Sequence, residues 1–208
     1  MKVVLYGASG MVGSRILREL IARGHDVTAV VRKPADVSEP EATVLQGDVF
    51  DENSVFTTAK GMDAAISAYG PGHARPAVLP QAARTLLGGL QKAGVRRFLM
   101  LGGAGSLEVA PGVRLVDTPT FLAEWKPIAL AHAGALAELR ASNLDWTSVS
   151  PSALMQPGQR TGTFRLGQDS LLTDSHGESK ISAEDFAMAV VDELEKPRHI
   201  RQRFTVGY

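Results

Sequence analysis

The chain opens with a short apolar run that leads directly into a glycine-rich turn. Residues 2–6 (KVVLY) have the composition of a strand, and the following GASGMVG places glycines at positions 7, 10 and 13. Apolar residues then recur at helical spacing over residues 11–22, and the pattern stops at Gly24. A strand, a tight turn and a helix start aim backbone N–H groups at one point, and glycines let a diphosphate approach them. The spacing predicts that Gly7 permits the turn, Gly10 the close approach, and Gly13 tight packing of the helix on the strand.

Strand-like and helix-like segments alternate through the first two-thirds of the chain. The strand-like segments that follow are residues 26–31, 43–47, 62–68, 97–101 and 145–149. Helical patterns lie near residues 51–60, 77–93 and 120–141. Continuous apolar strands separated by helices are typical of a mostly parallel sheet covered on both faces. The sequence therefore predicts a doubly wound, Rossmann-like α/β fold, with the ligand crevice at the carboxyl ends of the strands.

The last third of the chain is less regular. Residues 161–167 and 170–172 are predicted to be short strands, and the alternating residues 203–208 a closing strand. The sequence SAED at 182–185 predicts a capping box that opens a helix running to about residue 195, before Lys196-Pro197. No repeat or linker is present, so residues 1–208 are expected to form a single nucleotide-binding domain. Its part from about 150 to 208 would be a small extension that completes the substrate side.

Composition excludes several classes of protein. Charges balance to a formal net charge of zero, which predicts no binding to nucleic acid or to an anionic membrane surface. No apolar stretch is long enough to span a bilayer or resembles a signal peptide, so a cytoplasmic protein is expected. The chain has no cysteine, and its five histidines lack metal-binding spacing, so no metal site is expected.

The end of the second predicted strand indicates which nucleotide would bind. An acidic residue at this position would bind the 2′-hydroxyl of an adenosine ribose, but the chain has Arg32 and Lys33. Two cations favour a 2′-phosphate, so NADP(H) is preferred over NAD(H), unless the pair is only a solvated turn. Asp48 follows the third strand and is placed to accept a hydrogen bond from the adenine amino group. Alternatively it caps the next helix, a position for which Asp51 is better suited.

Several motifs together resemble a known family. They are GASGMVG at 7–13, VRK at 31–33, GD at 47–48, SAYG at 67–70, LDWT at 144–147, SP at 150–151, PGQRTG at 157–162, ISAEDFA at 181–187 and RFTV at 203–206. The chain is similar over essentially its whole length to atypical short-chain dehydrogenase/reductases of the NAD(P)H-binding, NmrA-like type. Within that group it looks like the branch described as NADH-flavin reductases, which is related to the biliverdin reductase B group.

The resemblance implies roles for individual positions. Gly7, Ser9, Gly10, Met11 and Val12 would surround the diphosphate, Arg32 the 2′-phosphate, and Asp48 with Val49 the adenine. By the same resemblance Ala68, Tyr69 and Gly70 would line the second ribose, and Ser150 with Pro151 would border the nicotinamide.

The chain departs from the family pattern at the catalytic position. Many relatives use a Tyr-x-x-x-Lys pair, in which lysine lowers the tyrosine pKa so that the phenol exchanges a proton with the substrate. The three tyrosines here are Tyr6, Tyr69 and Tyr208, and none begins that motif. His132 lies roughly where the missing tyrosine would fall and is the candidate proton donor or orienting group, or else a packing residue. Ser106, in the glycine turn after the fifth strand, is a second candidate catalytic residue.

The expected function is hydride transfer from NADPH to a small planar acceptor, a flavin or quinone that binds as substrate rather than as a resident cofactor. Such a reaction needs little from the protein beyond stacking the acceptor on the nicotinamide. Phe121 and Trp125 would form an apolar wall for the acceptor, or pack in the core. Two alternatives remain. One is a non-catalytic NADP(H)-binding redox sensor with a regulatory protein partner, and the other is a sugar-nucleotide epimerase or dehydratase.

Overall fold

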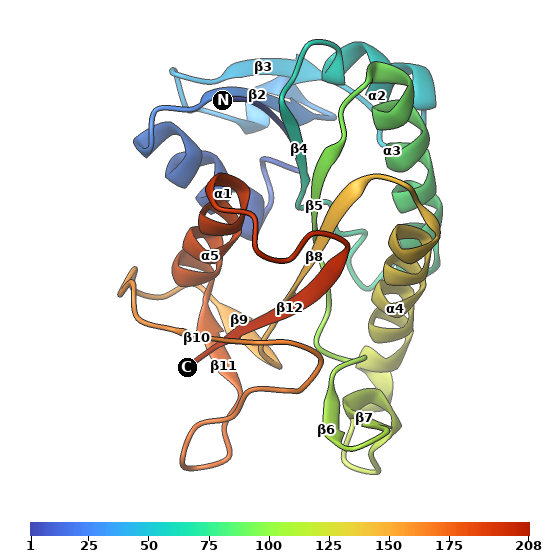
Figure 1. Ribbon diagram of the computed structural model, residues 1–208, viewed down its shortest axis with the longest axis vertical. Coiled ribbons are helices and arrows are strands. Elements are labelled where there is room, and N and C mark those ends of the chain that lie inside the picture. Colours follow the sequence, from blue (N-terminus) through green and yellow to red (C-terminus); the bar gives the residue numbers. More distant parts are fainter.

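The computed structural model describes all residues, 1–208, and is built on one sheet (Figure 1). Its eight strands lie in the order β10-β12-β8-β5-β4-β1-β2-β3, and all neighbouring pairs are parallel except β10 with β12. These strands are β1 (Lys2–Tyr6), β2 (Asp26–Val31), β3 (Thr43–Gln46), β4 (Ala64–Ser67), β5 (Arg97–Leu101), β8 (Asp145–Pro151), β10 (Arg165–Gly167) and β12 (Gln202–Gly207). The predicted doubly wound α/β fold is confirmed.

Helices cover both faces of the sheet, as Figure 1 shows. On one side α1 (Met11–Ala22) packs against α5 (Ala183–Glu195), and on the other α2 (Glu52–Ala59), α3 (Leu79–Ala93) and α4 (Lys126–Ala141) pack in sequence. Each layer has its own buried core. The α1–α5 side buries apolar residues of both helices against the sheet, including Ile16, Leu20 and Phe186. The opposite core includes Leu86, Leu90 and Leu136.

Side-chain caps fix two of the helix starts. Asp51, and not Asp48, caps α2, because its Oδ1 accepts a hydrogen bond from Asn53 N at 2.9 Å. Ser182 caps α5, since its Oγ accepts from Asp185 N at 3.0 Å. The second half of the predicted capping box does not form, because Ser182 N donates instead to the Tyr208 hydroxyl at 3.2 Å. The Asp185 carboxylate is therefore free to bind elsewhere.

Some predicted boundaries were wrong. The helix predicted over 120–141 begins only at Lys126, after a 3₁₀ turn at Ala123–Trp125. Pro127 explains this start, because proline lacks an N–H and fits the first turn of a helix but not its interior. The strand predicted over 161–167 is restricted to β10, and 170–172 forms no strand, with only an isolated bridge between Ser170 and Glu108.

Four very short strands were not predicted. They form two small sheets, β6 (Glu108–Ala110) with β7 (Val113–Arg114) and β9 (Leu154–Gln156) with β11 (Lys180–Ser182). The segment 150–208 thus supplies β9 to β12 and α5, and two of its strands extend the main sheet. No helix has the length and apolar composition needed to cross a bilayer.

Candidate functional site

The turn between β1 and α1 leaves the start of the helix open to an anion. Gly7 has φ +80°, in the left-handed region, and a Cβ there would lie 2.8 Å from Tyr69 N. At Gly13 a Cβ would overlap the Gly7 carbonyl, so α1 packs directly on the turn. Gly10 is the N-cap residue, with no side chain capping the helix. The nearest atom to a Cβ at Gly10 would be Gly7 O at 3.4 Å, so this position faces open space. Unpaired N–H groups behind a bare glycine fit a diphosphate.

A cavity of about 540 Å³ begins at this helix start and extends along the carboxyl ends of the strands. This is the size of pocket that binds a small organic ligand. Its lining includes most of the residues predicted from the sequence, namely Gly7, Ser9, Gly10, Met11, Val12, Arg32, Asp48, Val49, Ala68, Tyr69, Gly70 and His132. Lys33, Ser106, Ser150 and Pro151 do not line it.

One end of the cavity lies beyond β2 and β3. Arg32, immediately after β2, faces the cavity, whereas Lys33 is exposed outside it. Asp48 is exposed, and its Oδ1 accepts a hydrogen bond from Phe50 N at 2.9 Å, which orders the turn after β3. Phe50 packs edge-to-face on Tyr69, with 5.7 Å between ring centroids. This end therefore combines one cation, one carboxylate and two aromatic rings.

The other end is formed by α4 and the end of β5. Leu101, Ile128 and His132 line it. His132 packs on Gly103, where a Cβ would come within 2.8 Å of the histidine Cβ. Its Nδ1 is buried without a hydrogen-bond partner, and burial lowers the His132 pKa to about 4. At neutral pH the imidazole is therefore uncharged, so it suits the predicted orienting role better than that of a charged proton donor.

Ser106 lies away from this cavity. Its Oγ accepts a hydrogen bond from Arg203 Nη1 at 2.8 Å, and Arg203 Nε also donates to Asp169 Oδ1 at 2.7 Å. The hydroxyl is thus engaged in joining the loop after β5 to the start of β12. Ser150 and Pro151 are buried at the end of β8, and Ser150 Oγ has no hydrogen-bond partner.

The three tyrosines have different surroundings. Burial raises the pKa of Tyr6 to about 12, and its hydroxyl hydrogen-bonds with Thr58 Oγ1 at 3.0 Å. Tyr208 donates to Asp185 Oδ2 at 2.7 Å. Tyr69 alone lines the cavity, where burial raises its pKa against the opposing effect of Arg32. No three His, Asp or Glu side chains are grouped so that they could hold a metal ion.

Sequence reasoning missed several lining residues, among them Phe50, Gly72, His73, Leu101 and Ile128. For two of these residues, the sequence position next to a predicted site residue could have indicated a place in the lining. Phe50 follows the Asp48-Val49 pair directly, and Ile128 lies one helical turn before His132 on the same face of α4. His73 had no such indication, because it lies in an irregular segment after β4 that has no periodicity.

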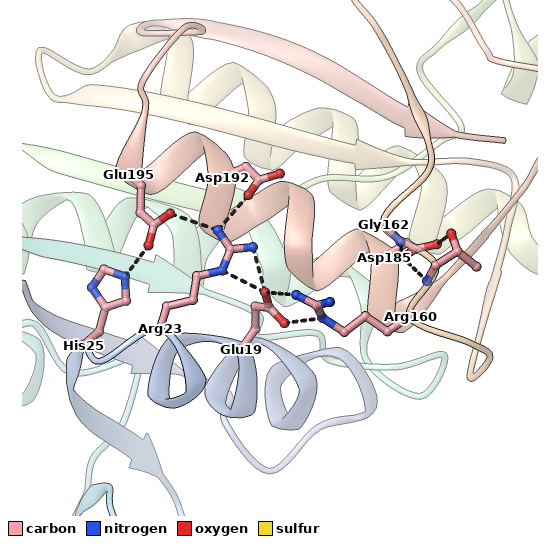
Figure 2. Close-up of polar contacts among 9 residues, drawn as sticks. Glu19, Arg23, His25, Arg160, Gly162, Asp185, Asp192 and Glu195 are labelled. Carbon is pink, nitrogen blue, oxygen red and sulfur yellow. Dashed lines mark hydrogen bonds and ion pairs between the residues drawn. The ribbon is translucent and has the colours of Figure 1, made fainter.

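A polar cluster around the buried carboxylate of Glu19 holds α1 on the side that faces α5 (Figure 2). Glu19, only 8% exposed, accepts from Arg23, the C-cap residue of α1, at 2.7 Å and from Arg160 at 2.9 Å. Arg160 and Arg23 together hold the pKa of Glu19 below its usual value. Arg23 also bonds Asp192 at 2.7 Å and Glu195 at 2.9 Å, both on α5. The cluster joins α1 to α5 and to the segment around Arg160.

Asp185 fixes the same segment a short distance away. Its Oδ1 accepts from Thr161 N at 2.8 Å and Gly162 N at 2.9 Å, and Oδ2 accepts from the Tyr208 hydroxyl. Burial alone would raise the Asp185 pKa, but these donors and the Thr161 hydroxyl lower it. A fully buried carboxylate with this many donors is a structural anchor.

Comparison with known proteins agrees with this geometry. The sequence profile of the NAD(P)H-binding family matches residues 7–197. A candidate exported protein from Burkholderia pseudomallei is 47% identical, with a TM-score of 0.93 over 100% of both chains. A candidate epimerase from Bacteroides thetaiotaomicron is 44% identical, with a TM-score of 0.92 over 100% of this chain and 96% of the other. A candidate NADH-flavin reductase from Streptococcus pneumoniae is 35% identical, with a TM-score of 0.87 over 100% of this chain and 99% of the other.

Proposed function

This chain belongs to the NAD(P)H-binding family, and from that premise we propose that it is a reductase that uses NADPH to reduce a planar acceptor of the flavin or quinone class. One observation carries the proposal. A single cavity begins at the uncapped start of α1 and ends at the apolar group of Leu101 and Ile128 beside His132. A dinucleotide lying along it would have its diphosphate at the helix and its nicotinamide at the apolar end.

The residues present fit the coenzyme. The free N–H groups behind Gly10 would bind the diphosphate, and the missing Cβ leaves room for it. Ala68, Gly70 and the backbone of Tyr69 would line the ribose nearer the nicotinamide, while the Tyr69 ring packs on Phe50 toward the other end. When bound, reduced coenzyme supplies a hydride, and this hydride together with one proton from solvent converts the acceptor to its two-electron-reduced form.

His132 would orient the acceptor rather than protonate it. Its imidazole is uncharged at neutral pH and lines the apolar end of the cavity, so it can donate or accept one hydrogen bond there. The name of the Bacteroides relative indicates an epimerase. An epimerase or dehydratase that exchanges a proton through a Tyr-x-x-x-Lys pair would need a tyrosine near the position of His132. The helix α4 offers none.

Arg32 supports a preference for NADP(H) over NAD(H). It is the cation that follows β2 and faces the cavity, and no carboxylate at that position competes for a ribose hydroxyl. We expect Arg32→Asp to weaken NADPH binding by about 10-fold to 100-fold, the value of one charge-assisted hydrogen-bonded contact, and to change NADH binding little. Lys33→Asp makes the same charge change outside the cavity and is the matched control. Equal affinities of the wild type for NADPH and NADH in calorimetry would refute the preference.

Turnover is tested by stopped-flow mixing of the NADPH-loaded protein with FMN, FAD and benzoquinone. The proposal requires that at least one of them accelerates the loss of NADPH absorbance above the rate without protein. Binding of NADPH with no turnover by any acceptor would reject the reductase and favour the redox sensor. In that case a regulatory protein partner would be expected to distinguish the reduced from the oxidised complex.

A further inference from the structure

An aromatic pair joins a residue that lines the cavity, His73, to one that lies just outside the lining, Trp125. His73, on the segment after β4, lines the cavity and packs edge-to-face on Trp125, with 4.3 Å between ring centroids and 83° between ring planes. Trp125 immediately precedes α4. Two segments far apart in the sequence therefore meet at this end of the site through planar side chains. An edge-to-face contact occupies one face of one ring only, so other ring faces stay free for a third planar group.

Trp125 belongs to the same stripe of the helix as the lining residues. Trp125, Ile128 and His132 follow the i, i+3, i+7 spacing that places side chains on one helix face, and Trp125 itself has helical φ and ψ. Seven residues of an α-helix rise about 10 Å. The stripe between Trp125 and His132 is thus long enough for a fused multi-ring system, and a single six-membered ring would reach only part of it.

The exposure of Trp125 also needs an explanation. Its side chain is 47% exposed, although it packs against the ring of His73, which lines the cavity. Tryptophan is among the side chains that gain most from burial and stacking. Leu122 nearby is 61% exposed but belongs to no such pair, so it gives a matched comparison.

We propose that His73 and Trp125 form the acceptor subsite and select fused multi-ring planar acceptors over single-ring ones. This inference rests on the proposed reductase function. Stacking on His73 and Trp125 would hold the far end of a fused ring system, whereas a single ring placed against the nicotinamide would not reach the pair. The pair therefore contributes to binding of the larger acceptor and leaves the smaller one almost unaffected.

The test compares riboflavin, which has three fused rings, with benzoquinone, which has one. We expect Trp125→Ala to lower kcat/KM for riboflavin about fivefold to tenfold, mainly through KM, and to change kcat/KM for benzoquinone less than twofold. His73→Ala is expected to act in the same direction, and Trp125→Phe to keep most of the riboflavin activity. Leu122 is an exposed apolar residue of the same segment, and Leu122→Ala should leave kcat/KM unchanged for both acceptors.

A binding measurement accompanies the kinetics. Riboflavin added to the NADP⁺-bound protein, where no turnover occurs, should quench wild-type tryptophan fluorescence far more than that of Trp125→Phe, in which only Trp146 reports. If both acceptors are reduced but the kcat/KM ratio is unchanged in Trp125→Ala and no quenching is seen, the subsite is wrong and the reductase proposal stands. If no acceptor is reduced, the reductase proposal fails, and the quenching measurement alone decides whether the pair binds a fused ring.

Discussion

A single methyl group added at Gly10 should weaken coenzyme binding markedly without unfolding the protein. Gly10 has φ −74° and ψ 168°, which alanine adopts freely. The nearest atom to the added Cβ would be Gly7 O at 3.4 Å, an ordinary contact. The methyl group therefore meets little protein and instead fills the place where the diphosphate approaches the first N–H groups of α1.

The magnitudes follow from this geometry. The loss of one charge-assisted hydrogen bond to the diphosphate costs about 1.5 to 3 kcal/mol, so Gly10→Ala should weaken NADPH binding roughly 10-fold to 150-fold. The free energy of unfolding should change by less than about 1 kcal/mol, because alanine reduces the entropy of the unfolded chain but is a poor N-cap. Gly13→Ala makes a contrasting variant, since its Cβ would overlap the Gly7 carbonyl. Overpacking of about 1 to 3 kcal/mol should lower its melting temperature by roughly 3 to 10 °C.

Calorimetric titration with NADPH and thermal unfolding followed by circular dichroism separate the two effects. Ser14→Ala, on the same helix but outside the cavity lining, controls for any substitution in α1. A Gly10→Ala variant that binds NADPH as tightly as the wild type would refute a diphosphate site at the start of α1. A loss of stability in Gly10→Ala as large as that in Gly13→Ala would refute it too, because the added methyl group would then contact protein rather than ligand.

Three further substitutions test other parts of the structure. His132 has a pKa of about 4 when folded and about 6.5 when unfolded, so the unfolded chain binds more protons in between, and stability falls as the pH drops. Between pH 7 and pH 5 the free energy of unfolding of the wild type, measured by urea titration, should fall by about 2 kcal/mol more than that of His132→Gln. If the two proteins show the same dependence of unfolding free energy on pH, the imidazole is not buried and neutral. Asp185→Ala leaves the Thr161 and Gly162 amides without an acceptor and should cost about 2 to 4 kcal/mol of unfolding free energy, which an unchanged urea midpoint would disprove. Glu19→Gln should cost about 1 to 3 kcal/mol and increase protease cleavage near Arg160, while unaltered cleavage would show that the ion pair does not hold this segment.

The regular part of the fold could be predicted because the hydrophobic periodicity of each segment and the glycines that end it indicate the same boundaries. β1, α1 and β2 carry apolar runs of the right length, bounded by glycines, and the predicted ranges match the observed ones. Predictions were wrong where tertiary contacts outweigh local pattern. β9 and β11 are only three residues long and exist because they pair with each other, which no local signal reports. Residues 170–172 have the composition of a short strand but lack a partner beyond one bridge between Ser170 and Glu108.

The same limit applies to the site. The residues at strand ends, such as Arg32 and Asp48, could be placed in advance because parallel strands bring their carboxyl ends to one edge. Lys33 and Ser106 could not be separated from true lining residues by spacing alone. Lys33 points outward one position after Arg32, and Ser106 is held by Arg203 from a strand almost a hundred residues away.

The packing of α1 on α5 has a consequence for biosynthesis. The apolar face of α1, with Ile16, Leu17 and Leu20, leaves the ribosome long before its partner helix α5, because the rest of the sheet is encoded between them. While the residues between the two helices are synthesised, that face lacks its α5 cover, and long-range closure of this kind slows folding. We therefore expect nascent chains released before α5 emerges to be chaperone-bound or to aggregate, however well the first half of the sheet has formed.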